Sequence, residues 1–224
     1  MSLTIVHTPT VISGTKRRYG VPTYNGPYTI MLWIRFTSLS LVLPTDFVGL
    51  YELTNETTTL PSEGLQIVLV DGERRVQFFT RDSGGTLHTV TSFQPIQLDQ
   101  WYNIALIRHS TNAASVSISG LVTLVFLQEL GQRTSCATLG IVDMANVAAT
   151  FTIGVMKIWD KAIGKKELIS EMNTIRAQDR NELNSLYFFN SLGSIRFPDL
   201  GIHNYFLPTF SASGDPRRTP PIIY

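Results

Sequence analysis

The segment Leu98–Arg108, which reads LDQWYNIALIR, decides the fold class of this chain. A short polar turn leads into a strand headed by a tryptophan, and a second polar turn over residues 110–112 leads into the alternating segment Ser115–Gly120. Alternation of polar and apolar residues at a period of two is typical of a strand with one buried face. The segment therefore predicts a β-hairpin that belongs to a two-sheet sandwich.

Strand patterns continue on both sides of this hairpin. Thr29–Phe36 has apolar residues at every second position, and Leu65–Leu69 does the same before the turn pair Asp71-Gly72. Residues 121–127 are apolar on both faces, as expected either for a central strand that is covered on both sides or for an edge strand that is covered by a partner. The remaining predicted strands are 76–80, 86–91, 151–159 and 186–190.

One short amphipathic helix is predicted over residues 164–176, in the C-terminal third of the chain. Gly164 can serve as its start, and two glutamates occupy the early turns, where the helix dipole favours acidic side chains. The apolar residues at helical spacing are Leu168, Met172 and Ile175. We expect this helix to lie on the sandwich.

Length and composition fit one domain. The chain has 224 residues, of which 43% are hydrophobic and 16% charged, and its formal net charge is +1. Ordinary soluble domains have about 25% charged residues, so the low value indicates β-rich structure or a surface covered by a partner. The near-neutral balance predicts no nucleic acid partner and no membrane partner. We expect a sandwich domain over residues 1–209 and a Pro-rich arm over 210–224.

The single cysteine, Cys136, excludes an internal disulfide, and we expect it to be a small buried thiol. No apolar stretch approaches the ~18 residues of a transmembrane helix. Residues Met1–Thr10 lack the basic head and apolar run of a signal peptide.

Four blocks in the same order resemble the laminin-G-like and concanavalin A-like (lectin and glucanase) jelly-roll superfamily, including its pentraxin-like members. The blocks are Gly26–Arg35, Gln100–Leu106, Thr152–Ile163 running into Gly164–Glu167, and Asn184–Asn190 followed by Phe197–Asn204. The resemblance covers most of residues 26–207 and implies an all-β sandwich of two antiparallel sheets. We expect no cofactor: the resemblance makes calcium the one candidate, and its acidic ligands are not identifiable because acidic residues do not cluster in this sequence.

Candidate catalytic residues are not found. The glucanases of this superfamily carry a Glu-x-Asp-x-x-Glu strand, which places paired carboxylates on one face, and this run is absent. Glu52, Glu56 and Glu63 lie in a loop-like region without an Asp at strand spacing, while Glu167 and Glu171 share a helix face. We interpret all five as solvated carboxylates.

Other catalytic and metal-binding patterns are also missing. His7, His88, His109 and His203 are scattered without zinc-ligand spacing. The sequence contains no Gly-x-Ser-x-Gly nucleophile motif, no phosphate-binding loop and no dinucleotide-binding fingerprint. The sequence therefore predicts a protein that is not an enzyme, with no catalytic residue and no metal ligand.

Aromatic residues supply the candidate ligand contacts. We expect the three tryptophans, Trp33, Trp101 and Trp159, to pack in the core. Tyrosines in apparent loops are better placed to stack on a ligand, and these are Tyr24, Tyr51 and Tyr205.

The C-terminal segment Phe210–Tyr224 loses all periodicity and is rich in Ser, Gly and Pro. It is either an arm that docks on another protein chain or a disordered end. The residues that would make the docking contacts are Arg217, Arg218, Ile222, Ile223 and Tyr224.

Three functions from different classes fit these patterns. The first is a structural or recognition module, such as a phage virion surface or decoration protein, whose partners are the subunits of an assembly in a homo-oligomer. The second is a carbohydrate-binding lectin or adhesion module, extracellular or on a cell surface, exported by a non-classical route. The third is a glycoside hydrolase. We favour the first, located on the virion surface, because a virion component needs no export signal and because low charge suits a subunit packed against neighbours.

Overall fold

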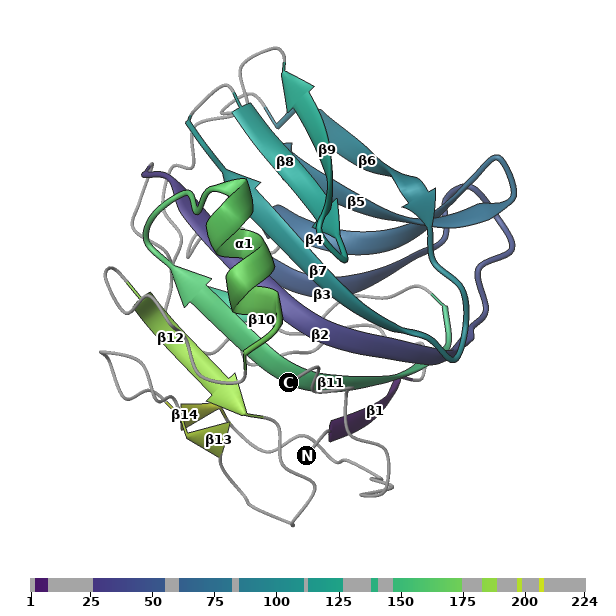
Figure 1. Cartoon of the computed structure of the whole chain (residues 1–224). Helices are drawn as coiled ribbons and strands as arrows, with labels where there is room; N and C mark the ends of the chain where they lie inside the picture. The colour runs from purple at the N-terminus through teal and green to yellow at the C-terminus, as the bar shows by residue number, and fades with distance from the viewer. Residues whose placement is uncertain are drawn as a thin grey trace.

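The chain forms two facing antiparallel sheets with one short helix on the outside, as Figure 1 shows. The structure is a computed structural model, and it describes residues 3–7, 26–54, 61–81, 85–110, 113–126, 138–140, 147–174, 183–188, 197–198 and 206–207. The predicted all-β jelly-roll sandwich with one short helix is therefore confirmed.

The larger sheet has seven strands among the described residues. Its order is β1 (Leu3–His7), β11 (Ala149–Trp159), β2 (Tyr28–Leu39), β7 (Trp101–Arg108), β8 (Ala113–Ile118) and β9 (Leu121–Phe126). Strand β12 (Leu183–Phe188) pairs with the second half of β11, on the edge where β1 pairs with the first half. The segment Leu98–Arg108 thus leads into the centre of this sheet.

The smaller sheet has five strands within the part of the chain that the structure describes. Its order is β10 (Thr138–Gly140), β3 (Phe47–Thr54), β4 (Pro61–Val70), β5 (Glu73–Arg81) and β6 (Leu87–Pro95). A separate pair is formed by β13 (Phe197–Pro198) and β14 (Phe206–Leu207). Every strand pair is antiparallel.

Both predicted hairpins form. In the β7–β8 hairpin Ile104 lies opposite Ile118. Between β4 and β5, Asp71 and Gly72 have φ angles of 52° and 77°. Two consecutive positive φ angles match the twist of two-residue hairpin turns, and Asp-Gly tolerates them.

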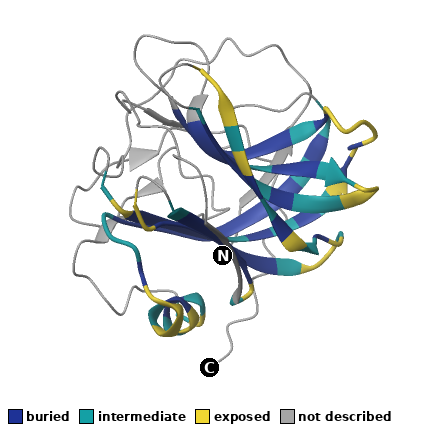
Figure 2. Cartoon of the chain, turned by 90° about the horizontal axis from the view of Figure 1, so that it is seen from above, coloured by how far each residue is buried: buried dark blue, intermediate teal, exposed yellow. Residues whose placement is uncertain are grey.

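The main core lies between the two sheets. The alternating residues of β2 that were predicted to share a face are all buried there, with at most 2% exposure. They meet the inward residues of β11, and the rings of Phe36 and Phe151 lie 5.8 Å apart. In Figure 2 the middle of both sheets is buried, whereas exposed residues gather at strand ends and on the outer side of the helix.

Helix α1 (Lys165–Met172) covers the outer face of the seven-stranded sheet. Gly164, the predicted start, is the N-cap of this helix, and its N–H donates to the Glu167 carboxylate at 3.1 Å. The helix ends at Met172, earlier than predicted, and Ile175 is outside the described residues. A second apolar cluster joins it to the sheet: Met31, Ala105, Ile107, Val155, Trp159, Ile163 and Leu168.

The tryptophans are not equivalent. Trp159 is fully buried beneath α1, which confirms core packing for that residue. Trp33 and Trp101 are only partly buried. Trp101 lies on the outer face of the seven-stranded sheet, with the guanidinium carbon of Arg35 5.8 Å from its ring centre. Within the described part of the chain, no helix has the length and apolar character needed to cross a membrane.

Candidate functional site

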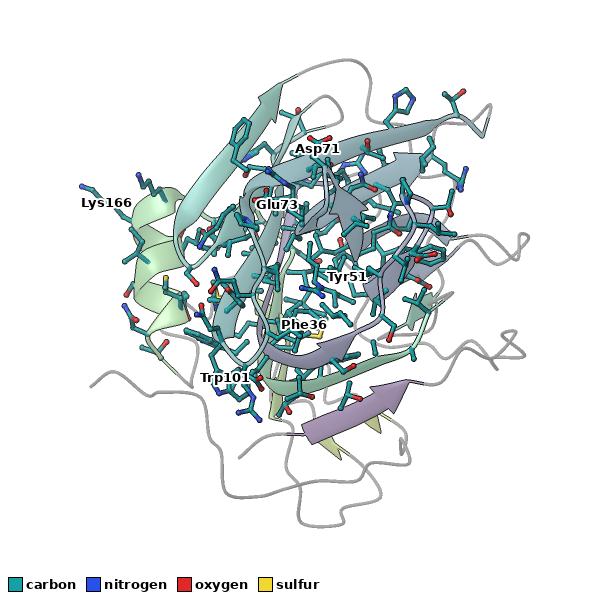
Figure 3. The ribbon with its side chains drawn as sticks, turned by 90° about the vertical axis from the view of Figure 1, so that its right-hand side faces the viewer. Phe36, Tyr51, Asp71, Glu73, Trp101 and Lys166 are labelled. Atoms are coloured by element: carbon teal, nitrogen blue, oxygen red, sulfur yellow. The ribbon has the colours of Figure 1, made fainter. Side chains whose placement is uncertain are left out.

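Tyr51, predicted to stack on a ligand from a loop, lies instead in strand β3 and is 0% exposed. The placement of Tyr51 in a loop is therefore wrong, and its ring offers no face to a ligand. A register shift between Gly49 and Tyr51 brings both Leu50 and Tyr51 into the core, which breaks the alternation by which the strand would be recognised. In Figure 3 Tyr51 and Phe36 both point into the space between the sheets.

The other predicted contact residues cannot be placed. Both remaining tyrosines and the whole C-terminal arm lie outside the described residues, namely Tyr24, Tyr205, Arg217, Arg218, Ile222, Ile223 and Tyr224. They stay predictions.

A buried charged network joins the two sheets instead. The carboxylate of Glu63, on β4, accepts hydrogen bonds from the Tyr28 hydroxyl on β2 and from the Arg108 guanidinium on β7. The hydroxyls of Tyr28 and Tyr51 lie 3.2 Å apart. Because Tyr28 donates to Glu63, Tyr51 donates to Tyr28. All four residues are 0% exposed, so this network ties the sheets together inside the sandwich.

This arrangement corrects the interpretation of the glutamates as solvated. Glu52 and Glu63 are strand residues with 3% and 0% exposure, and Glu171 is 1% exposed. Leu53 faces Glu63 across the β3–β4 ladder, so alternation directs Glu52 to the opposite face of the sheet. The two carboxylates cannot flank one glycosidic bond, as a hydrolase would require. Glu56 is outside the described residues.

Glu171 serves to attach the helix. On the outer face of β11, the Lys157 ammonium donates to the Glu171 carboxylate and to its backbone carbonyl, both at 2.8 Å, and to the Thr174 hydroxyl at 3.1 Å. Burial lowers the pKa of Lys157, and the bond to Glu171 opposes that shift. The half-buried Glu167 carboxylate pairs with Lys161 at 2.9 Å.

A row of amides crosses the outer face of the five-stranded sheet. The Gln66 amide on β4 donates to the Gln77 side-chain carbonyl on β5 at 2.8 Å, and the Gln77 amide donates to the Thr91 hydroxyl on β6 at 3.0 Å. All three side chains are partly exposed. Each amide nitrogen keeps a second N–H, so this row can still donate hydrogen bonds to a ligand.

An exposed ring lies two residues along β6 from this row. Phe93 is 78% exposed, the highest value among the described large apolar residues. Val90 and Ser92 are buried at 3% and 2% exposure, so burial along β6 still alternates and Phe93 lies on the outward side with Thr91. One Arg75 nitrogen donates to the carbonyls of Ser92 and Phe93 at 3.1 and 2.9 Å, which fixes the irregular end of the strand. We call the surface formed by Gln66, Gln77, Thr91, Arg75 and Phe93 the β4–β6 face.

A second exposed apolar group lies in the loop before β3. Val42 and Leu43 are 74% and 57% exposed. The Asp46 carboxylate accepts both of their backbone N–H groups, at 2.8 and 2.7 Å. These two bonds, with Leu43 contributing most, lower the pKa of Asp46. Among the described residues, no group of three acidic, histidine or cysteine side chains could hold a metal ion.

The residues of the amide row and Phe93 were not singled out from the sequence, because no local motif marks them. The amide row is formed by side chains from three strands, and Phe93 lies where the pairing of β6 with β5 shifts its register. Neither feature has a local sequence motif. The predicted strand 86–91 stops short of Phe93, whereas β6 continues to Pro95; extending the alternation of Leu87, Thr89 and Thr91 by one step would have placed this aromatic residue on the outward side.

Comparisons with known proteins inform the fold. No family model matches the sequence, and no curated protein matches it. Among solved structures, the chain is similar to the binding domain of botulinum neurotoxin DC in complex with rat synaptotagmin II, with 12% identity, a TM-score of 0.51, and coverage of 66% of this chain and 36% of that chain.

Two further similar structures belong to the same group. One is the binding domain of botulinum neurotoxin DC in complex with SialylT, with 12% identity, a TM-score of 0.50, and coverage of 66% of this chain and 35% of the other. The other is the serotype D binding domain, with 11% identity, a TM-score of 0.50, and coverage of 65% and 36%. This chain spans little more than a third of each. At such low identity the likeness shows that the chain shares a β-sandwich fold with these binding domains.

Proposed function

We propose that this chain is a non-enzymatic recognition module that binds a saccharide through the β4–β6 face. The observation that carries the proposal is the amide row of Gln66 and Gln77 beside the exposed ring of Phe93. Saccharide hydroxyls both donate and accept hydrogen bonds, which suits side-chain amides. The C–H face of a sugar ring is apolar and suits a ring such as Phe93. Large exposed apolar groups next to polar ones are typical of binding surfaces.

The carboxylates support the non-enzymatic part of the proposal. Glu63 is neutralised by Arg108 and Glu171 by Lys157, and both pairs are buried. A general acid or nucleophile must reach its substrate, and these carboxylates already serve the fold. The three similar structures are described as binding domains, which agrees with a recognition role, although a fold alone does not determine function.

The saccharide-binding proposal is tested on a panel of immobilised glycans with the full chain. We expect the wild type to retain at least one glycan, and Gln77→Ala to weaken that binding, because it removes the central member of the amide row. Leu43→Ala is the control, since it removes an exposed apolar side chain elsewhere on the surface. Retention of no glycan on the panel would contradict the proposal, as would equal binding by Gln77→Ala.

The non-enzymatic part has a separate test. Incubation with glucans and galactans should release no reducing ends. Reproducible release that is lost in Glu52→Gln would overturn this part, because Glu52 is the buried carboxylate that points away from the Glu63 network.

We further propose that the module lies on a virion surface, as a subunit of a homo-oligomer. Its support is the low charged fraction of 16% and the Pro-rich arm with an apolar tip. Deleting residues 210–224 should leave the melting midpoint of the sandwich unchanged and reduce the native mass to that of a smaller assembly. An unchanged native mass would contradict docking of the arm.

A further inference from the structure

Two buried polar side chains on the outer face of the seven-stranded sheet have atoms without hydrogen-bond partners. Both the oxygen and the nitrogen of the Asn103 side-chain amide are unpaired, and so is the hydroxyl of Ser117. Both residues are 0% exposed.

These two side chains are neighbours. Ala105 lies opposite Ser117 in the β7–β8 ladder, and Asn103 is two residues from Ala105 on the same face. Asn103 and Ser117 are therefore a diagonal cross-strand pair, whose Cα atoms are about 7–8 Å apart. At this separation one small molecule can reach both side chains.

The C-terminal end of α1 lies above this pair. Trp33 is opposite Asn103 on β2, and its indole N–H donates to the Met172 carbonyl at 3.0 Å. A Cβ placed on Gly120, which follows β8, would lie 3.5 Å from the Met172 sulfur. The helix end therefore closes over the sheet where the unpaired atoms are located.

We propose that Asn103 and Ser117 bind ordered water beneath the C-terminal end of α1. Buried polar groups are nearly always paired, with protein or with water, because an unpaired one loses its hydration without replacement. The amide supplies donors and an acceptor and the hydroxyl supplies both, which are the partners that a buried water needs. Helix α1 then packs on the apolar cluster through Leu168 and Met172, and the bound water lies beside that cluster, under the Met172 end of the helix.

The sign of one stability change tests this proposal. If water pairs with Ser117, Ser117→Ala removes a hydrogen bond and should lower the thermal midpoint. If the site is dry, the same substitution removes an unpaired polar group and should raise the midpoint. Ser115→Ala is the matched control, because Ser115 is the preceding outward serine on β8, is equally buried, and has the His109 ring nitrogen at 2.9 Å.

We expect Ser117→Ala and Ser115→Ala to shift the midpoint in the same downward direction. A midpoint for Ser117→Ala that is unchanged or higher than that of the wild type would overturn the proposal. A second measurement is independent of stability: the side-chain amide protons of Asn103 should show NMR cross-relaxation with a bound water, and that signal should weaken in Ser117→Ala. Absence of this cross-relaxation signal in the wild type would also overturn the proposal.

Discussion

Glu63→Gln should be among the most destabilising single substitutions in this chain. It keeps the shape of the side chain but removes the charge that balances Arg108, whose side chain is 1% exposed. The guanidinium then stays buried, with the Ser110 carbonyl at 3.3 Å and a neutral amide in place of the Glu63 carboxylate among its partners. Removing one partner of a buried ion pair costs about 3–5 kcal/mol. At about 2–4 °C per kcal/mol for a domain of this size, the melting midpoint should fall by roughly 6–20 °C.

The assay is equilibrium unfolding in urea, in which the midpoint should fall while the slope stays constant. Glu73→Gln is the matched control: its carboxylate pairs with Arg75 but is 48% exposed, so its loss should cost about 0–1 kcal/mol. The double variant Glu63→Leu with Arg108→Met should recover most of the loss, because well-packed apolar residues can replace a buried pair. A cost below about 1 kcal/mol for Glu63→Gln would refute the reasoning.

Three further predictions concern the core, a close approach of two strands, and pH. Trp159→Ala should cost about 3–5 kcal/mol in thermal unfolding and Trp101→Ala clearly less, because only Trp159 is fully buried; equal costs would contradict this difference. Gly64→Ala should cost about 1–3 kcal/mol in urea unfolding, since its Cβ would lie 2.7 Å from the ring of Phe79 and 2.7 Å from a backbone oxygen; a neutral effect would show that the strands can separate there. The Asp46 carboxylate accepts hydrogen bonds from two backbone N–H groups, and these bonds lower its pKa. The ionised carboxylate therefore stabilises the loop at pH values above the usual pKa of aspartate, and this stabilisation is lost as the pH falls through the lowered pKa. NMR shifts of those two amides should follow this titration, and they should be insensitive to pH in Asp46→Asn.

Periodicity made the fold predictable, and departures from periodicity hid most of the site. The regular alternation of β2 and the Asp71-Gly72 turn identified strands and a hairpin that the structure confirms. Tyr51 was misplaced because a bulge in β3 interrupts the alternation.

Burial of the carboxylates could not be predicted for a different reason. Glu63 meets Arg108 across 45 positions of sequence, and Glu171 meets Lys157 across 14 positions between a helix and a strand. Such pairs depend on how sheets and helix pack, which no local pattern records. A glutamate in a polar stretch therefore looks the same in sequence whether it is solvated or ion-paired in the core.

Phe93 is the converse case, an aromatic residue that is exposed where a pattern of hydrophobicity predicts burial. Phe93 belongs to a strand whose inward residues alternate correctly, yet an aromatic residue is expected in the core. The ring nevertheless faces outward with 78% exposure, beside the register shift between Arg75 and Gln77.

The central claim is that the β4–β6 face is the recognition surface, and calorimetric titration of Phe93→Ala with a glycan retained by the wild type tests it most directly. Because Phe93 is 78% exposed, its removal should leave the melting midpoint within a degree or two of the wild type, as about 0.5 kcal/mol is typical of surface substitutions. The affinity should fall at least about tenfold, equivalent to about 1.4 kcal/mol of lost contact. Leu43→Ala should bind as the wild type does. An unchanged affinity in Phe93→Ala, with binding still present, would contradict the claim and place the recognition surface elsewhere on the sandwich.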